Sequence, residues 1–295
     1  MKYIWIIIIA FLFSCKSEVK EKKVVKLTNT EKTQLKDFGN KLEKSINNYE
    51  YELIKNSWNN SVFRKRVKGL AKTEQTVFDH YFDKDFGTKI ENENIDLVNK
   101  LKFNSGKIFF SKIIFYPKHA EIVFTMLFNQ NVDFWKYRVE LVNTIPQLTD
   151  YYSYRDELWK SRNMKNLIRL NARYTATSQK RHQTNRSLTE YAEYLRYGDS
   201  LSALESLYKV PETHLIGNGL SLKRINLAYN LGDSILAYSL ERERELNQSI
   251  YIRYLYGYYF YDTLELNNVF GELKDELGIS NQMIDSLVQL DYFWN

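Results

Sequence analysis

Cysteine, proline and histidine are scarce in this chain of 295 residues, which has one, three and four of them respectively. A single cysteine excludes a disulfide within the chain, so stability must come from core packing. No two histidines have the spacing of a metal-binding pair. The sequence also lacks a Gly-rich phosphate loop and a Gly-x-Ser-x-Gly nucleophile elbow. We therefore expect no catalysis, no cofactor and no metal.

Aromatic residues are abundant instead. The chain has 17 Phe, 23 Tyr and 5 Trp, and 44% of its residues are hydrophobic, which is typical of a folded protein with a large core. Its net charge of +6 is a small excess of 42 basic over 36 acidic residues, spread along the chain. No basic stripe interleaved with aromatic residues stands out, so we expect no nucleic-acid partner.

The N-terminus has the pattern of a secretory signal. Met1-Lys2 is followed by an apolar run over residues 3–13, which is too short to span a bilayer because a membrane helix needs about 20 apolar residues. The run ends in Leu12-Phe13-Ser14-Cys15, which resembles a bacterial lipobox. The resemblance implies cleavage before Cys15 and attachment of lipid to this cysteine. The alternative is an ordinary signal with an incidental cysteine.

On this interpretation the chain divides into four parts. Residues 1–14 are a signal peptide, and residues 15–30 are a lysine-rich, lipidated tether. An α+β unit follows over 31–154, and a helical unit over 155–295. We expect the protein in the cell envelope, anchored through its N-terminal lipid to the inner or the outer membrane and facing the periplasm.

The α+β unit changes its hydrophobic period from helical to strand-like. Up to residue 104, apolar residues recur three and four positions apart, as on one face of a helix. Beyond it the period becomes two, which predicts a four-stranded antiparallel meander with the helices on one face. The expected helices are one through Leu35, Phe38, Leu42, Ile46 and Tyr49 and shorter ones at 62–70, 74–82 and 94–103, and the expected strands are 107–116, 120–129, 134–142 and 147–154.

Alternation is clearest in the third expected strand. Trp135 and Tyr137 lie on one face, and Lys136 and Arg138 on the other, which predicts a half-buried strand. Helices followed by a four-stranded meander resemble the SnoaL-like cone fold, also called nuclear-transport-factor-two-like, over 31–154. An open cystatin-like sheet has the same order of elements. Because cones of this kind hold apolar ligands, the resemblance implies a cavity, and its expected lining includes Phe124, Phe128, Trp135 and Tyr137.

The helical unit contains an internal repeat. Gly198-Asp199-Ser200-Leu201 recurs 34 residues later as Gly232-Asp233-Ser234-Ile235. In each copy the Gly-Asp pair is expected to end one helix and cap the next. A third turn is expected one period further, at Leu266-Asn267-Asn268.

A period of 34 residues with two helices in each unit resembles tetratricopeptide repeats. Some bulky and glycine positions of that family are unfilled, and its usual proline after the second helix is missing, so generic helical hairpins are the alternative. The expected helix pairs are 187–210, 220–246 and 250–277, preceded by a long helix at 156–182 and followed by one at 281–290.

Tyrosines crowd one of these expected helices. A helix that is aromatic on all sides must be covered on more than one side, so core packing is the simpler interpretation. Tyrosine also suits a recognition groove, because its ring is apolar and its hydroxyl is polar. The residues assigned to such a groove are Tyr251, Tyr254, Tyr258 and Tyr261.

Three weaker candidates have simpler explanations. Asp79-His80, with Asp83 and Asp85 nearby, is the densest metal-capable cluster, but it is typical of a solvated helix surface. His119 and Glu121 form a conceivable acid–base pair that chance also produces on a strand. The segment 241–245 alternates Glu and Arg, as an exposed helix face does.

A lipobox, a cone-like unit and a short tetratricopeptide-like tail together resemble uncharacterised lipoproteins of Gram-negative bacteria. We therefore expect a lipid-anchored envelope protein that binds another protein or a peptide without catalysis. The alternative is a small-molecule binder or enzyme that uses an apolar cavity within 31–154.

Overall fold

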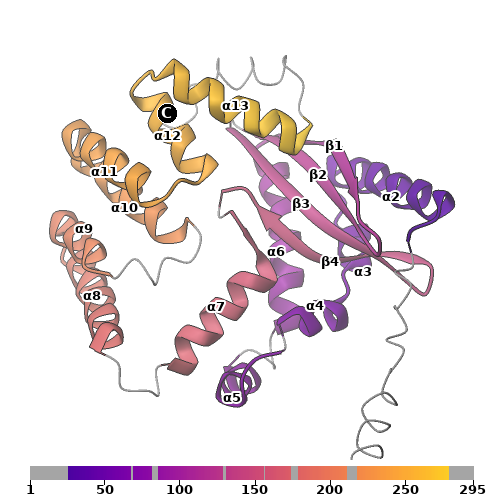
Figure 1. Ribbon diagram of the computed structural model, residues 1–295, viewed down its shortest axis with the longest axis horizontal. Helices are drawn as coiled ribbons and strands as arrows, with labels where there is room; N and C mark the ends of the chain where they lie inside the picture. The colour runs from indigo at the N-terminus through magenta and orange to yellow at the C-terminus, as the bar shows by residue number, and fades with distance from the viewer. Residues whose placement is uncertain are drawn as a thin grey trace, which may run out of the picture.

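The structure is a computed structural model in which an antiparallel sheet with its helices is followed by a series of helix pairs (Figure 1). The predicted order of an α+β arrangement followed by helices is confirmed. The predicted signal peptide, Cys15 and most of the predicted tether lie outside the described residues. No helix of the described part is long and apolar enough to cross a membrane. The structure describes residues 26–67, 69–81, 86–128, 131–155, 157–173, 179–210 and 218–278.

Helix α2 (Asn29–Asn47) begins at a capping box. The Thr28 hydroxyl accepts a hydrogen bond from the Glu31 backbone N at 3.2 Å, and the Glu31 carboxylate accepts one from the Thr28 backbone N at 2.7 Å. Its predicted apolar stripe is buried, whereas Tyr49 lies just beyond the helix and packs against the core. The next helices are α3 (Glu52–Ser57), which was not predicted, α4 (Asn60–Val67), α5 (Lys72–Tyr81) and α6 (Phe86–Phe103).

The sheet has five strands in the order β1-β2-β3-β4-β5, all antiparallel. The four predicted strands are present, with ends within three residues of those expected. The fifth strand is two residues long, and no period can be read over that length. The strands are β1 (Lys107–Phe115), β2 (Ala120–Phe128), β3 (Asn131–Val142), β4 (Ile145–Ser153) and β5 (Leu158–Trp159).

Both faces of the sheet are covered by helices (Figure 1). On the inner face, Ile122 and Val139 pack with helices from the first part of the chain. On the outer face, Val123 and Phe134 pack against Leu273 of α13 (Thr263–Leu277), the last described helix. On the polar side of β3, Lys136 is therefore buried rather than solvated, because α13 covers it.

The segment after the sheet does not form the long helix predicted at 156–182. Strand β5 occupies its beginning, and α7 (Lys160–Arg173) and α8 (Gln179–Arg196) are separate helices. The Asp150 carboxylate accepts a hydrogen bond from the Ser161 backbone N at 3.1 Å, so this buried strand residue fixes the start of α7. The sequence pattern did not reveal that tertiary cap.

Three helix pairs follow, close to the predicted positions. Each pair packs against the next, so the helices form a sequential stack. The expected final helix at 281–290 lies outside the described residues. The pairs are α8 with α9 (Ser200–Tyr208), α10 (Gly219–Leu231) with α11 (Asp233–Leu246), and α12 (Ile250–Tyr259) with α13.

The turns within the pairs follow the predicted chemistry in part. Gly198 has φ +77°, and the Asp199 carboxylate accepts a hydrogen bond from the Ser202 backbone N at 3.0 Å. Gly232 ends α10 with φ +110°, but it is itself the N-cap residue of α11, which has no side-chain cap. Asp233 lies in the first turn of α11, where its negative charge favours the helix dipole.

The third predicted turn is wrong. Leu266-Asn267-Asn268 lies inside α13, and the chain reverses earlier, at Tyr261. The Asp262 carboxylate caps α13 by accepting a hydrogen bond from the Glu265 backbone N at 3.0 Å. The 34-residue period fails here mainly because only three residues, 247–249, connect α11 to α12, whereas ten residues, 209–218, lie between α9 and α10.

Close packing of α12 on α13 leaves little room for a side chain at position 257. A Cβ atom there would lie 3.1 Å from the Leu266 Cγ, whereas a Cβ at Gly271 would meet nothing within 4 Å. The two glycines therefore have different roles, although both lie inside helices.

We expect Gly257→Leu to lower the free energy of unfolding by about 1–3 kcal/mol, because the added side chain overpacks this contact. Gly271→Ala should raise it by about 0.5–1 kcal/mol, because alanine has the higher helix propensity and has room. Urea denaturation followed by circular dichroism measures both. Equal effects at the two positions would contradict the close approach of α12 and α13.

Candidate functional site

The inner face of the sheet is filled by its own aromatic side chains. Phe124 and Tyr137, two of the expected cavity-lining residues, are fully buried, and their rings meet edge to face at 6.1 Å. Trp135 is partly buried and stacks on Tyr151 at 4.9 Å. The Tyr137 hydroxyl donates to the Asn94 side-chain oxygen at 3.2 Å. These groups occupy the space that a ligand would need; the side chain of Phe128 lies outside the described set.

The outer face carries a buried group of charges beneath α13. Lys136 Nζ lies 3.3 Å from the Glu121 carboxylate and 3.7 Å from that of Glu276 on α13. The same ammonium lies over the Tyr152 ring at 4.8 Å from its centroid. Burial alone would raise the pKa of Glu121, but His119 and Lys136 hold it below its ordinary value. The ion pair therefore compensates charges that α13 removes from water.

His119, the expected acid–base partner of Glu121, has its ring fixed on three sides. Arg138 Nη2 lies 3.2 Å from His119 Nδ1, and because a guanidinium can only donate, Nδ1 must accept. The ring proton then lies on Nε2, which faces the Glu121 carboxylate at 3.8 Å. The ring also stacks on Tyr116 at 4.5 Å. This arrangement holds the histidine in place by contacts within the protein, which favours a structural role.

Asp150 lies on the same face, directly opposite Arg138, which is itself opposite Glu121 in the sheet. It is 3% exposed, and burial raises its pKa to about 6, although hydrogen bonds from Ser161 act in the opposite direction. Its carboxylate also accepts a hydrogen bond from the Tyr151 backbone N at 3.0 Å. This carboxyl group therefore keeps its proton to a higher pH than an exposed aspartate does.

The tyrosines expected to form a groove do not share one surface. Tyr251 packs against the core shared by α9–α12, whereas Tyr254 packs against the cluster between the sheet and α13. Tyr258 lies beside Tyr254, with their ring centroids 6.2 Å apart. Tyr261 is 86% exposed, in the turn before α13. Core packing thus accounts for Tyr251 and Tyr254, and only Tyr261 is largely exposed.

The alternating segment 241–245 is not the exposed helix face that the sequence suggested. Glu243 is fully buried and accepts a hydrogen bond from Arg224 Nη1 at 3.0 Å. Arg224 also donates to the Leu207 backbone oxygen at 2.8 Å, so three helices meet at one guanidinium. Arg242 stacks on the Tyr208 ring at 4.0 Å. This end of the helix pairs is held by buried polar contacts.

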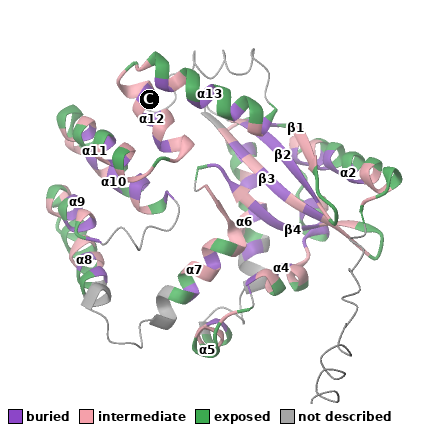
Figure 2. Ribbon diagram, viewed as in Figure 1, coloured by how far each residue is buried: buried purple, intermediate pink, exposed green. Residues whose placement is uncertain are grey.

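The opposite ends of the pairs are exposed and include several large aromatic and aliphatic side chains. We call the three turns the hairpin edge, defined as residues 194–201, 229–235 and 258–264. These turns lie on the side of the helical part that faces away from the sheet (Figure 1), where Figure 2 shows exposed residues on α8 to α11. The Tyr259 hydroxyl donates to the Asp233 backbone oxygen at 3.1 Å, which places the second and third turns together. The exposed large side chains of the hairpin edge are Tyr194, Leu195, Tyr197, Leu201, Tyr229, Tyr261 and Leu264.

A regular spacing of tyrosines in the sequence, distinct from the Gly-Asp repeat, marks the hairpin edge. Tyr197, Tyr229 and Tyr261 follow one another at intervals of 32 residues. Each precedes the second helix of its pair by two to four residues. This spacing of tyrosines, unlike the spacing of the glycines, extends to the third turn.

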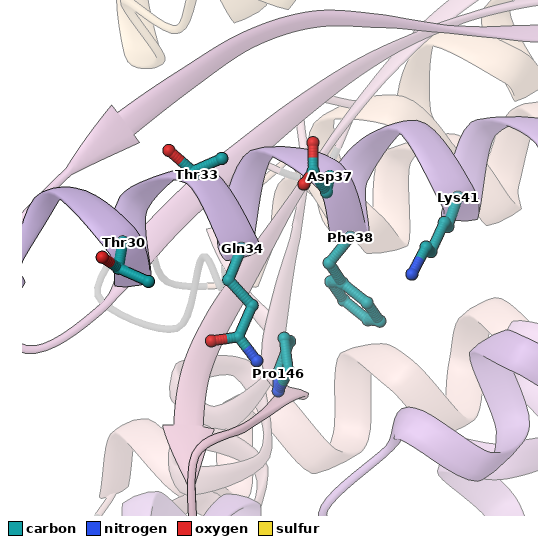
Figure 3. A pocket seen from close by; sticks show the side chains of 7 residues that line it. All are labelled: Thr30, Thr33, Gln34, Asp37, Phe38, Lys41 and Pro146. Carbon is teal, nitrogen blue, oxygen red and sulfur yellow. The ribbon is translucent and has the colours of Figure 1, made fainter.

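A pocket of about 550 Å³ lies between α2 and the β3–β4 turn (Figure 3). Gln34 and Phe38 point toward Pro146, whereas Thr33 and Asp37 lie on the other side of the helix in this view. The Gln34 amide donates to the Thr144 backbone oxygen at 2.7 Å, so it fixes the turn. The polar groups of this pocket do not converge on one point.

The expected metal-capable cluster is described only in part, because Asp83 and Asp85 lie outside the described residues. Over the rest of the described chain, no three His, Asp or Glu side chains gather closely enough to hold a metal ion. The hairpin edge is therefore the strongest candidate site.

We expect the Asp150→Asn variant to gain stability relative to the wild type as the pH rises from 4 to 7. In the folded state Asp150 keeps its proton up to about pH 6, whereas in the unfolded chain it loses it near pH 4, so ionisation in this interval destabilises the fold. A shift of roughly two units corresponds to about 3 kcal/mol.

Urea denaturation at several pH values measures this difference. Asn retains the acceptor oxygen for Ser161 and removes the charge, and Asp37→Asn on the exposed side of α2 is the control. Parallel stability curves for wild type and Asp150→Asn would contradict the buried, raised carboxyl.

No protein-family model matches the chain, and no curated protein or solved structure has significant similarity to it. Its function must therefore be inferred from the arrangement of its own side chains.

Proposed function

We propose that this chain is a lipid-anchored protein of the cell envelope whose helix pairs form a scaffold that binds another protein or a peptide. In this proposal the pairs are tetratricopeptide-like, since three stacked pairs are about the smallest number that buries a continuous core. The sheet with its helices is SnoaL-like or cystatin-like and supports the helical stack.

The observation that carries the proposal is the contrast between the two ends of the helix pairs. One end is held by Arg224, Glu243 and the Leu207 backbone oxygen, whereas the hairpin edge at the other end exposes apolar side chains in all three turns. Exposed apolar side chains gathered in this way mark interaction surfaces more often than they support a fold. A rigid stack that presents such an edge suits protein recognition.

The alternative, a ligand site in an apolar cavity of the sheet, has less support. Phe124 and Tyr137 fill the inner face together with Trp135, and their polar atoms bond to neighbouring residues. A ligand there would have to displace these side chains.

The anchor rests on the sequence Leu12-Phe13-Ser14-Cys15. We expect cells that express the chain to attach an alkynyl palmitate to it, and the Cys15→Ser variant to remain unlabelled because it lacks the acceptor thiol. In-gel fluorescence after membrane fractionation measures both. Unlabelled, full-length wild-type protein in the cytosolic fraction would contradict the anchor.

We expect the soluble Cys15→Ser protein, when immobilised, to retain a specific protein from detergent-solubilised envelope. Retention should fall when an excess of the same soluble protein competes, and mass spectrometry identifies what is lost. A variant with the unrelated exposed substitution Phe103→Ser should retain the partner as the wild type does. No competed protein, with the fold intact by circular dichroism, would overturn the scaffold proposal.

A further inference from the structure

The tyrosines of the hairpin edge are more exposed than the fold requires. Tyr197 is 80% exposed, Tyr229 44% and Tyr261 86%, and Leu264 beside the third turn is 72% exposed. Burying a large apolar side chain would stabilise the protein by roughly 1.5–3 kcal/mol, and the exposed parts of these side chains forgo that gain and lower the solubility. The side-chain caps of the second helices come from Asp199 in the first turn and Asp262 in the third, whereas Tyr229 takes part in the second turn through its backbone oxygen, which accepts a hydrogen bond from the Gly232 backbone N.

The same turns are acidic, although the chain as a whole has a net charge of +6. Asp199, Asp233 and Asp262 each stand at or beside the start of a second helix, and Arg196 is the only basic residue of the hairpin edge. Capping explains the positions of Asp199 and Asp262, but Asn or Ser would cap as well without the charge. The surface that surrounds the tyrosines is therefore complementary to a cation.

The helical part already shows how its tyrosines bind cations. Arg242 lies over the Tyr208 ring at 4.0 Å, and Arg244 lies over the Tyr256 ring at 4.5 Å. Such contacts combine attraction to the ring with burial of the arginine stem. An exposed tyrosine beside a carboxylate offers the same contact to an arginine or lysine from outside.

We propose that the hairpin edge binds a polypeptide segment in which arginine or lysine side chains alternate with apolar ones. The basic side chains would lie over Tyr197, Tyr229 and Tyr261 and face the neighbouring aspartates, and the apolar ones would contact Leu201 and Leu264. The inference rests on the proposed scaffold function and names the chemistry of its partner.

The test uses a fluorescein-labelled peptide of alternating arginine and leucine and a matched peptide of alternating glutamate and leucine. Fluorescence anisotropy measures their binding to the soluble Cys15→Ser protein. The basic peptide should bind and the acidic peptide should not. The triple variant Tyr197→Ser/Tyr229→Ser/Tyr261→Ser should bind the basic peptide at least tenfold more weakly.

A second triple variant, Asp199→Asn/Asp233→Asn/Asp262→Asn, removes the charge and keeps the caps, since Asn caps a helix as well as Asp does. It should bind the basic peptide several-fold more weakly and lose most of the salt dependence between about 0.05 and 0.3 M NaCl. The double variant Phe103→Ser/Ile145→Ser, at exposed apolar positions outside the hairpin edge, should bind as the wild type does.

Unchanged binding in either triple variant, or equal weakening in the control, would overturn the inference. So would binding of a chito-oligosaccharide in place of the peptide, because tyrosines and carboxylates can also hold sugar rings. If the tyrosine variant still retains the competed envelope protein, the inference fails and the scaffold proposal stands. If no envelope protein is retained at all, the scaffold proposal fails with it.

Discussion

The packing of α13 on the outer face of the sheet determines much of the remaining structure. Val123 and Phe134 of the sheet meet Leu273 and Leu277 of the helix in one buried cluster. Because α13 is also the second helix of the third pair, this contact joins the helical stack to the sheet. The segment after β4 adds to the joint, since the Tyr251 backbone N at the start of α12 donates to the Glu157 carboxylate at 2.8 Å. Helix α13 therefore completes a core on the outer face that the strands of the sheet begin.

Covering the second face has an electrostatic consequence. Strand residues that would otherwise point into water are buried, and a buried charge is costly unless an opposite charge faces it. Lys136 therefore lies between the carboxylates of Glu121 and Glu276, and the Asp150 carboxylate accepts a hydrogen bond from the start of α7. The hydrogen bonds to Asp150 offset only part of the free energy that burial of its charge costs, so its pKa stays raised. These charges hold the sheet and its covering helices together. The shifted pKa values on this face therefore indicate contacts between layers rather than a reactive centre.

The sequence predicted the elements whose signals are local. Four strands were located because alternation such as Trp135 to Tyr137 depends only on neighbours, and Asp199 was identified as a cap from its turn. The features that the sequence did not predict depend on contacts between residues far apart in the chain. Covering of Lys136 depends on a helix more than a hundred residues away, and the break before α7 depends on Asp150. The third turn was misplaced because a fixed period does not account for the short connection between α11 and α12.

The hairpin edge shows why a candidate site can be harder to predict than a fold. Two of its aspartates cap helices, so the sequence pattern around them indicates turns. The exposed tyrosines beside them have no local pattern that indicates binding. At the other end of the pairs Arg224 bonds to two neighbouring helices and is 1% exposed. With one end fixed by buried polar contacts, the turns at the other end need little further stabilisation from their apolar side chains. Tyr197, Tyr229 and Tyr261 can then remain exposed without weakening the stack, which is the condition that a binding surface on a stable scaffold must meet.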